Sequence, residues 1–119
     1  MNEITPSELF EFYLETAKYC NSRVIFQSDE EMLYKLFEEF DSGVRSFFHD
    51  DSLQKLFKYD MINESVISTS RKIRHKWIEL ESKSYSLNEI RTTPEWREFF
   101  CLCDELNREL WGDQGVTSD

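Results

Sequence analysis

Helical periodicity along almost the whole chain is the feature that most limits what this sequence can fold into. Apolar side chains recur at steps of three and four residues, and no stretch between turn signals alternates with a period of two. The chain has only three Gly and two Pro in 119 residues, too few for a sandwich or barrel with many tight turns. The pattern therefore predicts an all-α fold, a single-domain bundle of about five helices.

Capped helix starts recur along the chain. They occur at Thr5-Pro6-Ser7-Glu8, at Ser28-Asp29-Glu30-Glu31 and at Thr93-Pro94-Glu95. The first two have the Ser/Thr-x-x-Glu spacing of a capping box, and two of the three place Pro in the first helical position. These signals predict helices that begin near residues 6, 29 and 94. The first is expected to end at Asn21-Ser22, with Leu9, Phe10, Phe12, Tyr13, Leu14, Ala17 and Cys20 on its apolar face.

The second helix is the clearest amphipathic one in the first half of the chain. Asp41-Ser42-Gly43 is expected to end it, with Gly43 in the left-handed conformation of a C-cap. Its predicted core stripe is Leu33, Leu36, Phe37 and Phe40, and its opposite face carries Glu31, Tyr34, Lys35, Glu38 and Glu39.

The remaining segments are predicted with the same signals. Val24-Ile25-Phe26 is a short apolar connector that could equally be a strand. Asp50-Asp51-Ser52 offers an N-cap for a helix that reaches Met61. A longer helix is expected from Asn63 to about Ser82, with Val66, Ser70, Ile73, Trp77 and Leu80 as its inner stripe.

The end of the chain completes the predicted domain. Residues 84–92 form a polar connection with one helical turn, and the last helix stops at Gly112. The domain is expected to cover residues 1–112, and residues 113–119 are expected to form a frayed tail. The last helix keeps one face apolar through Trp96, Phe99, Phe100, Cys103, Leu106 and Leu110.

Charge narrows the range of partners. The chain carries 24 acidic and 14 basic side chains, a net charge of −10, which argues against nucleic acid or an anionic membrane as the main partner. The excess is uneven, with −7 in residues 1–60, +2 in residues 61–91 and −5 in residues 92–119. The positive segment contains a basic ridge formed by Arg71, Lys72, Arg74, His75 and Lys76.

Cysteines and histidines suggest neither a metal site nor a cofactor. An odd number of cysteines gives no closed disulfide framework, so we expect reduced thiols and a cytoplasmic protein, in keeping with an N-terminus that lacks signal-peptide character. Cys101 and Cys103 would point about 200° apart on a helix and could not share an ion. His49-Asp50-Asp51 could belong to a cation site, but a loop that caps the next helix is the better interpretation. No nucleophile motif or phosphate-binding loop is present, and we expect no enzyme.

The acidic regions carry the functional hypothesis. Carboxylates interleaved with aromatic rings suit docking onto a basic protein, because charge speeds encounter and aromatic anchors supply buried area. The residues predicted to contact the partner are Glu31, Tyr34, Glu38, Glu39, Asp41, Asp50 and Asp51.

The basic ridge supports the alternatives. A small adaptor or regulatory protein could bind a protein or nucleic-acid partner through residues 71–76. Internal neutralisation of the ridge is the simpler interpretation. The acidic residues expected to neutralise it are Glu38, Glu39 and Asp41.

The whole chain resembles a bacterial family. Its opening, Met-Asn-Glu-Ile-Thr-Pro-Ser-Glu-Leu-Phe-Glu-Phe-Tyr-Leu (Met1 to Leu14), and its closing helix from Trp96 to Trp111 are similar to the helical immunity proteins of contact-dependent growth inhibition systems, the CdiI type. The resemblance implies that the partner is the C-terminal nuclease domain of a cognate toxin, which is bound tightly and blocked at its active site. A tRNA nuclease that also engages the host's cysteine synthase, in a ternary complex, is one form this takes. The resemblance assigns no individual residue.

Overall fold

The computed structural model describes the backbone of residues 4–117 and the side chains of residues 4–112. This part of the chain is helical with short connections and has no strand, so the predicted all-α class is confirmed. The elements in chain order are α1 (Pro6–Tyr19), the 3₁₀ helix η1 (Ser22–Phe26), α2 (Asp29–Leu33), the π-helix η2 (Tyr34–Phe40), α3 (Asp41–Phe47), α4 (Asp50–Lys58), α5 (Glu64–Glu81), α6 (Leu87–Thr92) and α7 (Pro94–Thr117).

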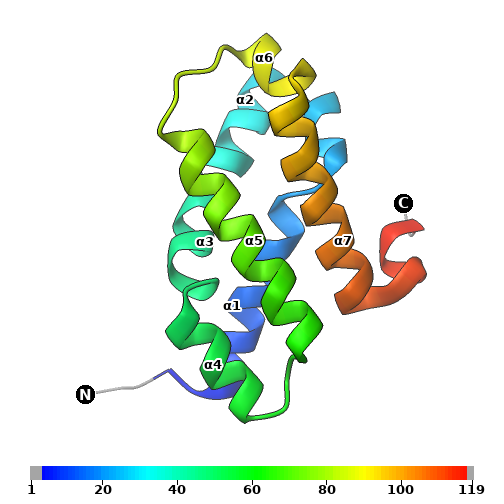
Figure 1. Cartoon of the computed structure of the whole chain (residues 1–119). Coiled ribbons are helices and arrows are strands. Elements are labelled where there is room, and N and C mark those ends of the chain that lie inside the picture. Colours follow the sequence, from blue (N-terminus) through cyan, green and yellow to red (C-terminus); the bar gives the residue numbers. More distant parts are fainter. Residues whose placement is uncertain (1–3, 118–119) are drawn as a thin grey trace.

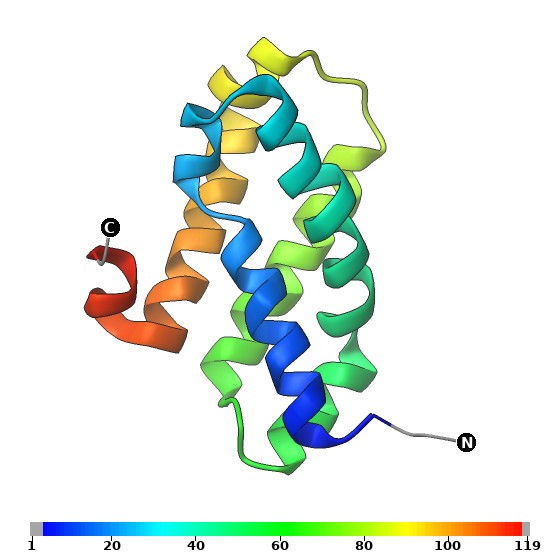
Figure 2. The ribbon, with the colours of Figure 1, turned by 180° about the vertical axis from the view of Figure 1, so that it is seen from behind.

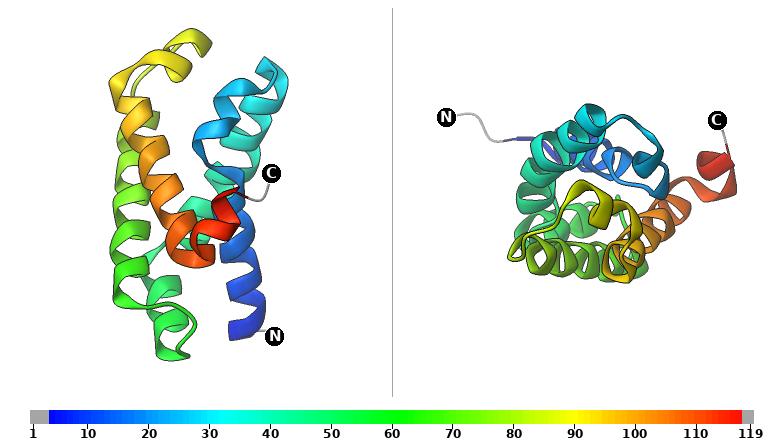
Figure 3. Two further views of the ribbon diagram at one scale, coloured as in Figure 1. Left: turned by 90° about the vertical axis from the view of Figure 1, so that its right-hand side faces the viewer. Right: turned by 90° about the horizontal axis from the view of Figure 1, so that it is seen from above.

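Four helical segments run alternately up and down and build the bundle (Figure 1). They are α1, the continuous α2–η2–α3 segment, α5 and α7. In side view α5 and α7 form one layer, and α1 with α2–η2–α3 forms the other (Figure 3). The short helices close the ends, with α4 at the bottom and α6 at the top of Figure 1. This is the up-down-up-down topology that short connections favour.

The second helical segment corrects the sequence prediction. It does not end at Asp41-Ser42-Gly43 but passes through the π-helix and continues to Phe47. Gly43 lies inside α3 and is buried, and Gly112 is the glycine with a positive φ among the described residues. A Cβ atom on Gly43 would lie 2.0 Å from Thr16 Oγ1 on α1. Glycine is therefore required here by the close approach of two helices and not by a C-cap.

The π-helix also changes which face of this segment is buried. The buried side chains are spaced four residues apart, whereas a regular α-helix would drift by about 40° at each such step. The wider π turn offsets this drift, so the buried side chains stay on one face of the segment. Leu33 and Phe37, predicted as core residues, are 38% and 37% exposed. The buried residues are Met32, Leu36, Phe40 and Val44.

Several predicted helix starts are confirmed. Thr5 and Glu8 form the reciprocal capping box of α1. The Asn63 side chain accepts the Val66 N–H at 2.9 Å and caps α5, whose bounds match the prediction to within one residue. Ser86 caps α6, which is the turn predicted within residues 84–92.

Two local predictions are wrong in detail. The cap of α4 is His49, whose Nδ1 accepts the Asp51 N–H at 3.1 Å, so Asp50 is already helical. The stretch therefore caps the next helix, as predicted, but through His49 and not through Asp50-Asp51-Ser52. The connector around Val24–Phe26 is part of η1 and not a strand.

An aromatic cluster around Trp77 joins the two layers. Trp77 is fully buried, and its ring centroid lies 5.1 Å from that of Phe40, 5.8 Å from that of Trp96 and 5.4 Å from that of Phe99. These rings come from η2, α5 and α7. The predicted inner stripes of α5 and α7 are thus confirmed as core, except that Leu110 is only half-buried.

Gly112 ends the straight part of α7. Its φ of 68° and ψ of −168° are non-helical and favour glycine, and they interrupt the helix at the residue where the sequence predicted its end. The backbone then turns away from the bundle and is helical again up to Thr117 (Figure 2). The frayed tail over residues 113–119 stays a prediction, since residues 118–119 lie outside the described part of the chain.

Candidate functional site

An acidic groove lies between α1 and the η2–α3 part of the second segment. Its volume is about 250 Å³. Thr16 and Gly43 meet within it, because the small glycine lets the two helices approach closely. Phe12, predicted as a core residue, is 45% exposed and stacks on Phe47 with ring centroids 5.2 Å apart. Three carboxylates and three aromatic rings line the groove: Glu15, Glu38 and Glu39, and Phe12, Tyr19 and Phe47.

The π-helix brings Tyr34 and Glu39 together beside this groove. In a regular α-helix, residues five positions apart point about 140° away from each other. Here the Tyr34 hydroxyl donates a hydrogen bond of 2.6 Å to Glu39 Oε1. This bond and the nearby negative charge of Glu39 raise the pKa of the Tyr34 phenol. Tyr34 therefore stays a neutral donor to the carboxylate.

Tyr19 plays a similar part on α1. Its hydroxyl donates to Glu15 Oε1 at 3.3 Å. Desolvation first, and then the charges of Glu39 and Glu15, raise the pKa of the Tyr19 phenol. The Tyr19 phenol is thus influenced by carboxylates from both α1 and η2. None of the described residues that line the groove is Lys or Arg. Such a groove suits a guanidinium or an ammonium group.

Part of the predicted contact surface gathers here. Glu38 and Glu39 line the groove, and Tyr34 is tied to it through Glu39. Glu31 lies one turn before Tyr34 and is exposed, and its backbone N–H donates to the Ser28 hydroxyl that caps α2. These residues form one side of the second segment.

Asp50 and Asp51 lie elsewhere. They begin α4, which is at the opposite end of the bundle from α2 (Figure 1). The Asp50 carboxylate pairs with Arg71 Nε at 2.8 Å, and this pair lowers the pKa of Asp50. The Asp51 side chain is 97% exposed. The predicted set of carboxylates therefore forms two separate surfaces and not one.

Asp41 has a structural partner. Its Oδ1 accepts the indole N–H of buried Trp77 at 2.7 Å and the Nε–H of Arg45 at 2.8 Å. Arg45 also pairs with Glu81 on α5. The carboxylate thus links the second segment to α5 through the indole of Trp77.

The basic ridge is partly neutralised within the protein, although not by the residues predicted. Lys76 Nζ lies 3.3 Å from a carboxylate oxygen of Glu98 and 3.5 Å from one of Glu79. With the Asp50–Arg71 pair, the acids come from α4, α5 and α7. The predicted neutralising residues were Glu38, Glu39 and Asp41, which lie on the second segment.

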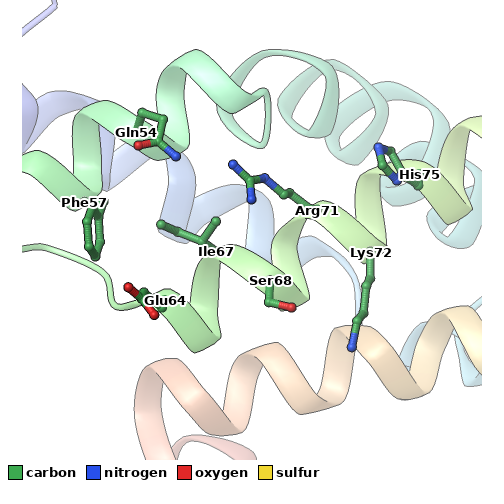
Figure 4. Close-up of a pocket in the computed structure, with 8 residues that line it drawn as sticks. All are labelled: Gln54, Phe57, Glu64, Ile67, Ser68, Arg71, Lys72 and His75. Atoms are coloured by element: carbon green, nitrogen blue, oxygen red, sulfur yellow. The ribbon is translucent and has the colours of Figure 1, made fainter.

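A hollow beside this ridge separates its remaining charges. It lies between α4 and α5 and has a volume of about 450 Å³ (Figure 4). Arg71 points toward α4, whereas Lys72 points toward α7. His75 and the ring of Phe57 stand further apart along the same hollow. Because the cations diverge, the hollow does not direct them at a single anion.

Metal binding and membrane spanning find no support in the described part of the chain. No cluster of three or more His, Cys, Asp or Glu side chains is arranged to hold a metal ion among these residues. None of the described helices combines the length and the apolarity that a bilayer crossing would need.

The sequence analysis did not predict the groove residues of α1 as part of the contact surface. Glu15 and Tyr19 have the spacing of four that lets side chains meet on a helix. That signal is local and common, and it does not reveal which helix packs alongside. The docking of α1 against a π-helix is what makes these two residues part of the same surface as Glu39.

Comparisons with protein-family models, with curated proteins and with solved structures find no match to this chain.

Proposed function

We propose that this chain is a cytoplasmic immunity protein that binds the basic nuclease domain of a cognate toxin and blocks its active-site cleft. The observation that supports this most is the acidic groove, in which carboxylates from two helices meet beside aromatic rings and no Lys or Arg of the described residues lines the wall. A nuclease needs Lys and Arg in its cleft to attract a polyanion. A row of fixed carboxylates offers such a cleft a substitute for phosphate.

The groove supplies both parts of a typical protein-binding surface. Glu38 and Glu39 would pair with cations of the toxin, and hydrogen bonds from phenols already orient the carboxylates of Glu15 and Glu39. Prior orientation reduces the entropy lost on binding. The exposed ring of Phe12 and the half-exposed ring of Tyr34 would supply apolar area at the same interface.

The net charge of −10 would act at longer range. It would accelerate encounter with a basic toxin, and it would oppose direct binding of this chain to nucleic acid. A tRNA nuclease as the toxin, and a ternary complex with cysteine synthase, rest on the family resemblance alone.

The test is a charge reversal in the groove with a matched control elsewhere. Glu38→Lys/Glu39→Lys and Glu95→Lys/Glu105→Lys change the net charge equally, and the second pair lies on exposed positions of α7 outside the groove. The partner is the nuclease domain encoded directly upstream of this chain's gene. Binding is measured by calorimetry at low salt and by stopped-flow association, after circular dichroism has shown that both variants are folded.

We expect the groove variant to associate more slowly and to lose about 2–5 kcal/mol of binding free energy, with the control close to wild type apart from its general charge effect. The groove variant should also fail to rescue growth when it is co-expressed with the toxin. Equal effects of the two variants would remove the groove from the proposal. A toxin domain that does not bind the wild-type chain, or an upstream gene that encodes no toxin, would contradict the function itself.

A nucleic-acid role for the basic ridge has a separate test. Salt-sensitive retention of the wild-type chain on tRNA or duplex DNA, lost in Arg71→Glu/Lys72→Glu, would favour that rival. We expect no retention, because internal ion pairs engage Arg71 and Lys76.

A further inference from the structure

Two cysteines that are far apart in the sequence meet in the core. Cys20 follows the last residue of α1, and Cys103 lies within α7. The thiol of Cys103 donates to the sulfur of Cys20, with the two Sγ atoms 2.9 Å apart. Both side chains are buried, with exposed fractions of 1% and 2%. A covalent disulfide is about 2.04 Å long, so a small approach of the two sulfur atoms would close the bond.

Neighbouring hydrogen bonds hold the two backbones in this register. The side-chain amide of Asn107 donates to the carbonyls of Ala17 (3.2 Å), Cys20 (3.4 Å) and Cys103 (2.8 Å). One turn earlier on α7, Asp104 Oδ1 accepts the Ser22 N–H at 2.9 Å. The end of α1 is therefore tied to α7 on both sides of the cysteine pair, and the contact between the thiols is a fixed feature of the packing.

We propose that Cys20 and Cys103 are the site of a reversible intramolecular disulfide, formed when a small oxidant such as hydrogen peroxide reaches the pair. One sulfur attacks the peroxide, the O–O bond breaks, and a sulfenic acid and one water result. The second sulfur attacks the sulfenic sulfur, the S–S bond forms, and a second water leaves. Two thiols are oxidised and one peroxide is reduced. A dithiol such as dithiothreitol reverses the step by exchange.

Burial sets the conditions for this reaction. Desolvation first, and the contact with Cys103 second, raise the pKa of the Cys20 thiol, so few thiolates form while the helices are packed. Oxidation then requires a local opening of the end of α1. When α1 packs against α7 again, the register set by Asn107 favours closure of the pair over other products. Cys101 is exposed and belongs to the other side of α7, so it takes no part in the cross-link.

The disulfide would close a loop that contains most of the chain. Long loops gain the most from such a cross-link, because the unfolded chain loses the most freedom. It would also fix the end of α1 next to Tyr19, which lines the acidic groove. The inference does not depend on the proposed function, and its test requires no partner.

The experiment measures thiols and melting temperature on the folded wild-type chain and on Cys101→Ser. After peroxide treatment, denaturation and thiol titration, Cys101→Ser should keep no thiol, and wild type should keep at most the thiol of Cys101. The oxidised monomer should be two hydrogen atoms lighter, and a non-reducing peptide map should join the peptides of Cys20 and Cys103. Its melting temperature should exceed that of the dithiothreitol-treated form by about 10 °C.

The same treatment of Cys103→Ser gives the matched control, which should form no intramolecular cross-link. Any of three results would overturn the proposal: oxidation of Cys101 with both other thiols intact, a cross-link that forms only after denaturation, or an oxidised form that melts no higher than the reduced one. The measurements on wild type decide the question even if Cys103→Ser fails to fold.

Discussion

Replacement of Gly43 by Ala tests the packing of the two helices that carry the acidic groove. The new Cβ would lie 2.0 Å from Thr16 Oγ1, 2.7 Å from its Cγ2 and 2.9 Å from its Cβ. Thr16 cannot turn aside easily, because it is buried, β-branched and donates its hydroxyl to the Phe12 carbonyl at 2.9 Å. One of the two helices must therefore shift.

Two opposing contributions determine the size of the effect. Alanine favours a helix over glycine by about 1 kcal/mol. Overpacking of a tight contact costs about 1–3 kcal/mol, and the distances here place Gly43→Ala at the upper end of that range. We expect a net loss of about 2 kcal/mol in the free energy of unfolding. In urea this corresponds to a midpoint about 1 M lower, with an unchanged slope.

A double-mutant cycle with Thr16→Ala separates two explanations for Gly43, the close approach of two helices and the C-cap. Thr16→Ala removes the two closest atoms and leaves the contact at 2.9 Å. In that background Gly43→Ala should be neutral to within about 0.5 kcal/mol, which corresponds to a coupling of about 1.5–2.5 kcal/mol. A helix-ending glycine with positive φ would lose stability equally in both backgrounds.

The assay is urea unfolding of the four proteins, followed by circular dichroism at equilibrium. A Gly43→Ala protein that is as stable as wild type would refute the close approach. A full loss of stability that persists beside Thr16→Ala would restore the C-cap interpretation.

Three further perturbations test the remaining contacts. Asp41→Ala leaves the buried indole N–H of Trp77 without an acceptor and should cost about 1–3 kcal/mol in urea unfolding. Asp51→Ala, at an exposed position, should change stability by less than about 0.5 kcal/mol. Equal effects of the two substitutions would contradict the structural role of Asp41. Burial raises the pKa of the Tyr13 phenol above its usual value of 10.0, so at high pH the folded state keeps a proton that the unfolded state releases. Stability should therefore be complete below pH 10 and fall above it by up to about 1.4 kcal/mol per pH unit. Tyr13→Phe should remove this slope when unfolding is measured as a function of pH. Asn107→Ala deletes an amide that donates to three backbone carbonyls and should cost about 1–3 kcal/mol, so wild-type stability in this variant would mean that these bonds do not tie α1 to α7.

The sequence was a good guide wherever a local pattern decides the outcome. The capping box at Thr5, the cap at Asn63 and the turn at Gly112 depend on groups within a few residues of each other. The stripes of α5 and α7 follow from a regular period of 3.6, and each residue predicted for them is buried except Leu110, which is half-buried.

The sequence was a poor guide to the second segment, α2–η2–α3, because a π turn has no clear local signature. Gly43 looked like a helix end, since a glycine after Asp41-Ser42 fits a C-cap as well as it fits a helix interior. Leu33 and Phe37 looked like core for the same reason. The predicted partner-binding set suffered likewise, because Asp41 and Asp50 are acidic in sequence but already paired in space.

The sequence by itself determined that this chain is helical, where most of its helices begin and end, and that its charge is strongly negative. These properties depend on backbone capping, on the period of apolar residues and on a count of ionisable groups, all of which are local or additive. Only the tertiary structure decided that Glu15 and Glu39 share one groove, that Asp41 supports Trp77, and that Cys20 lies against Cys103. Each of these depends on which helices pack side by side and in what register, which is set by the fit of the whole core and not by any one segment.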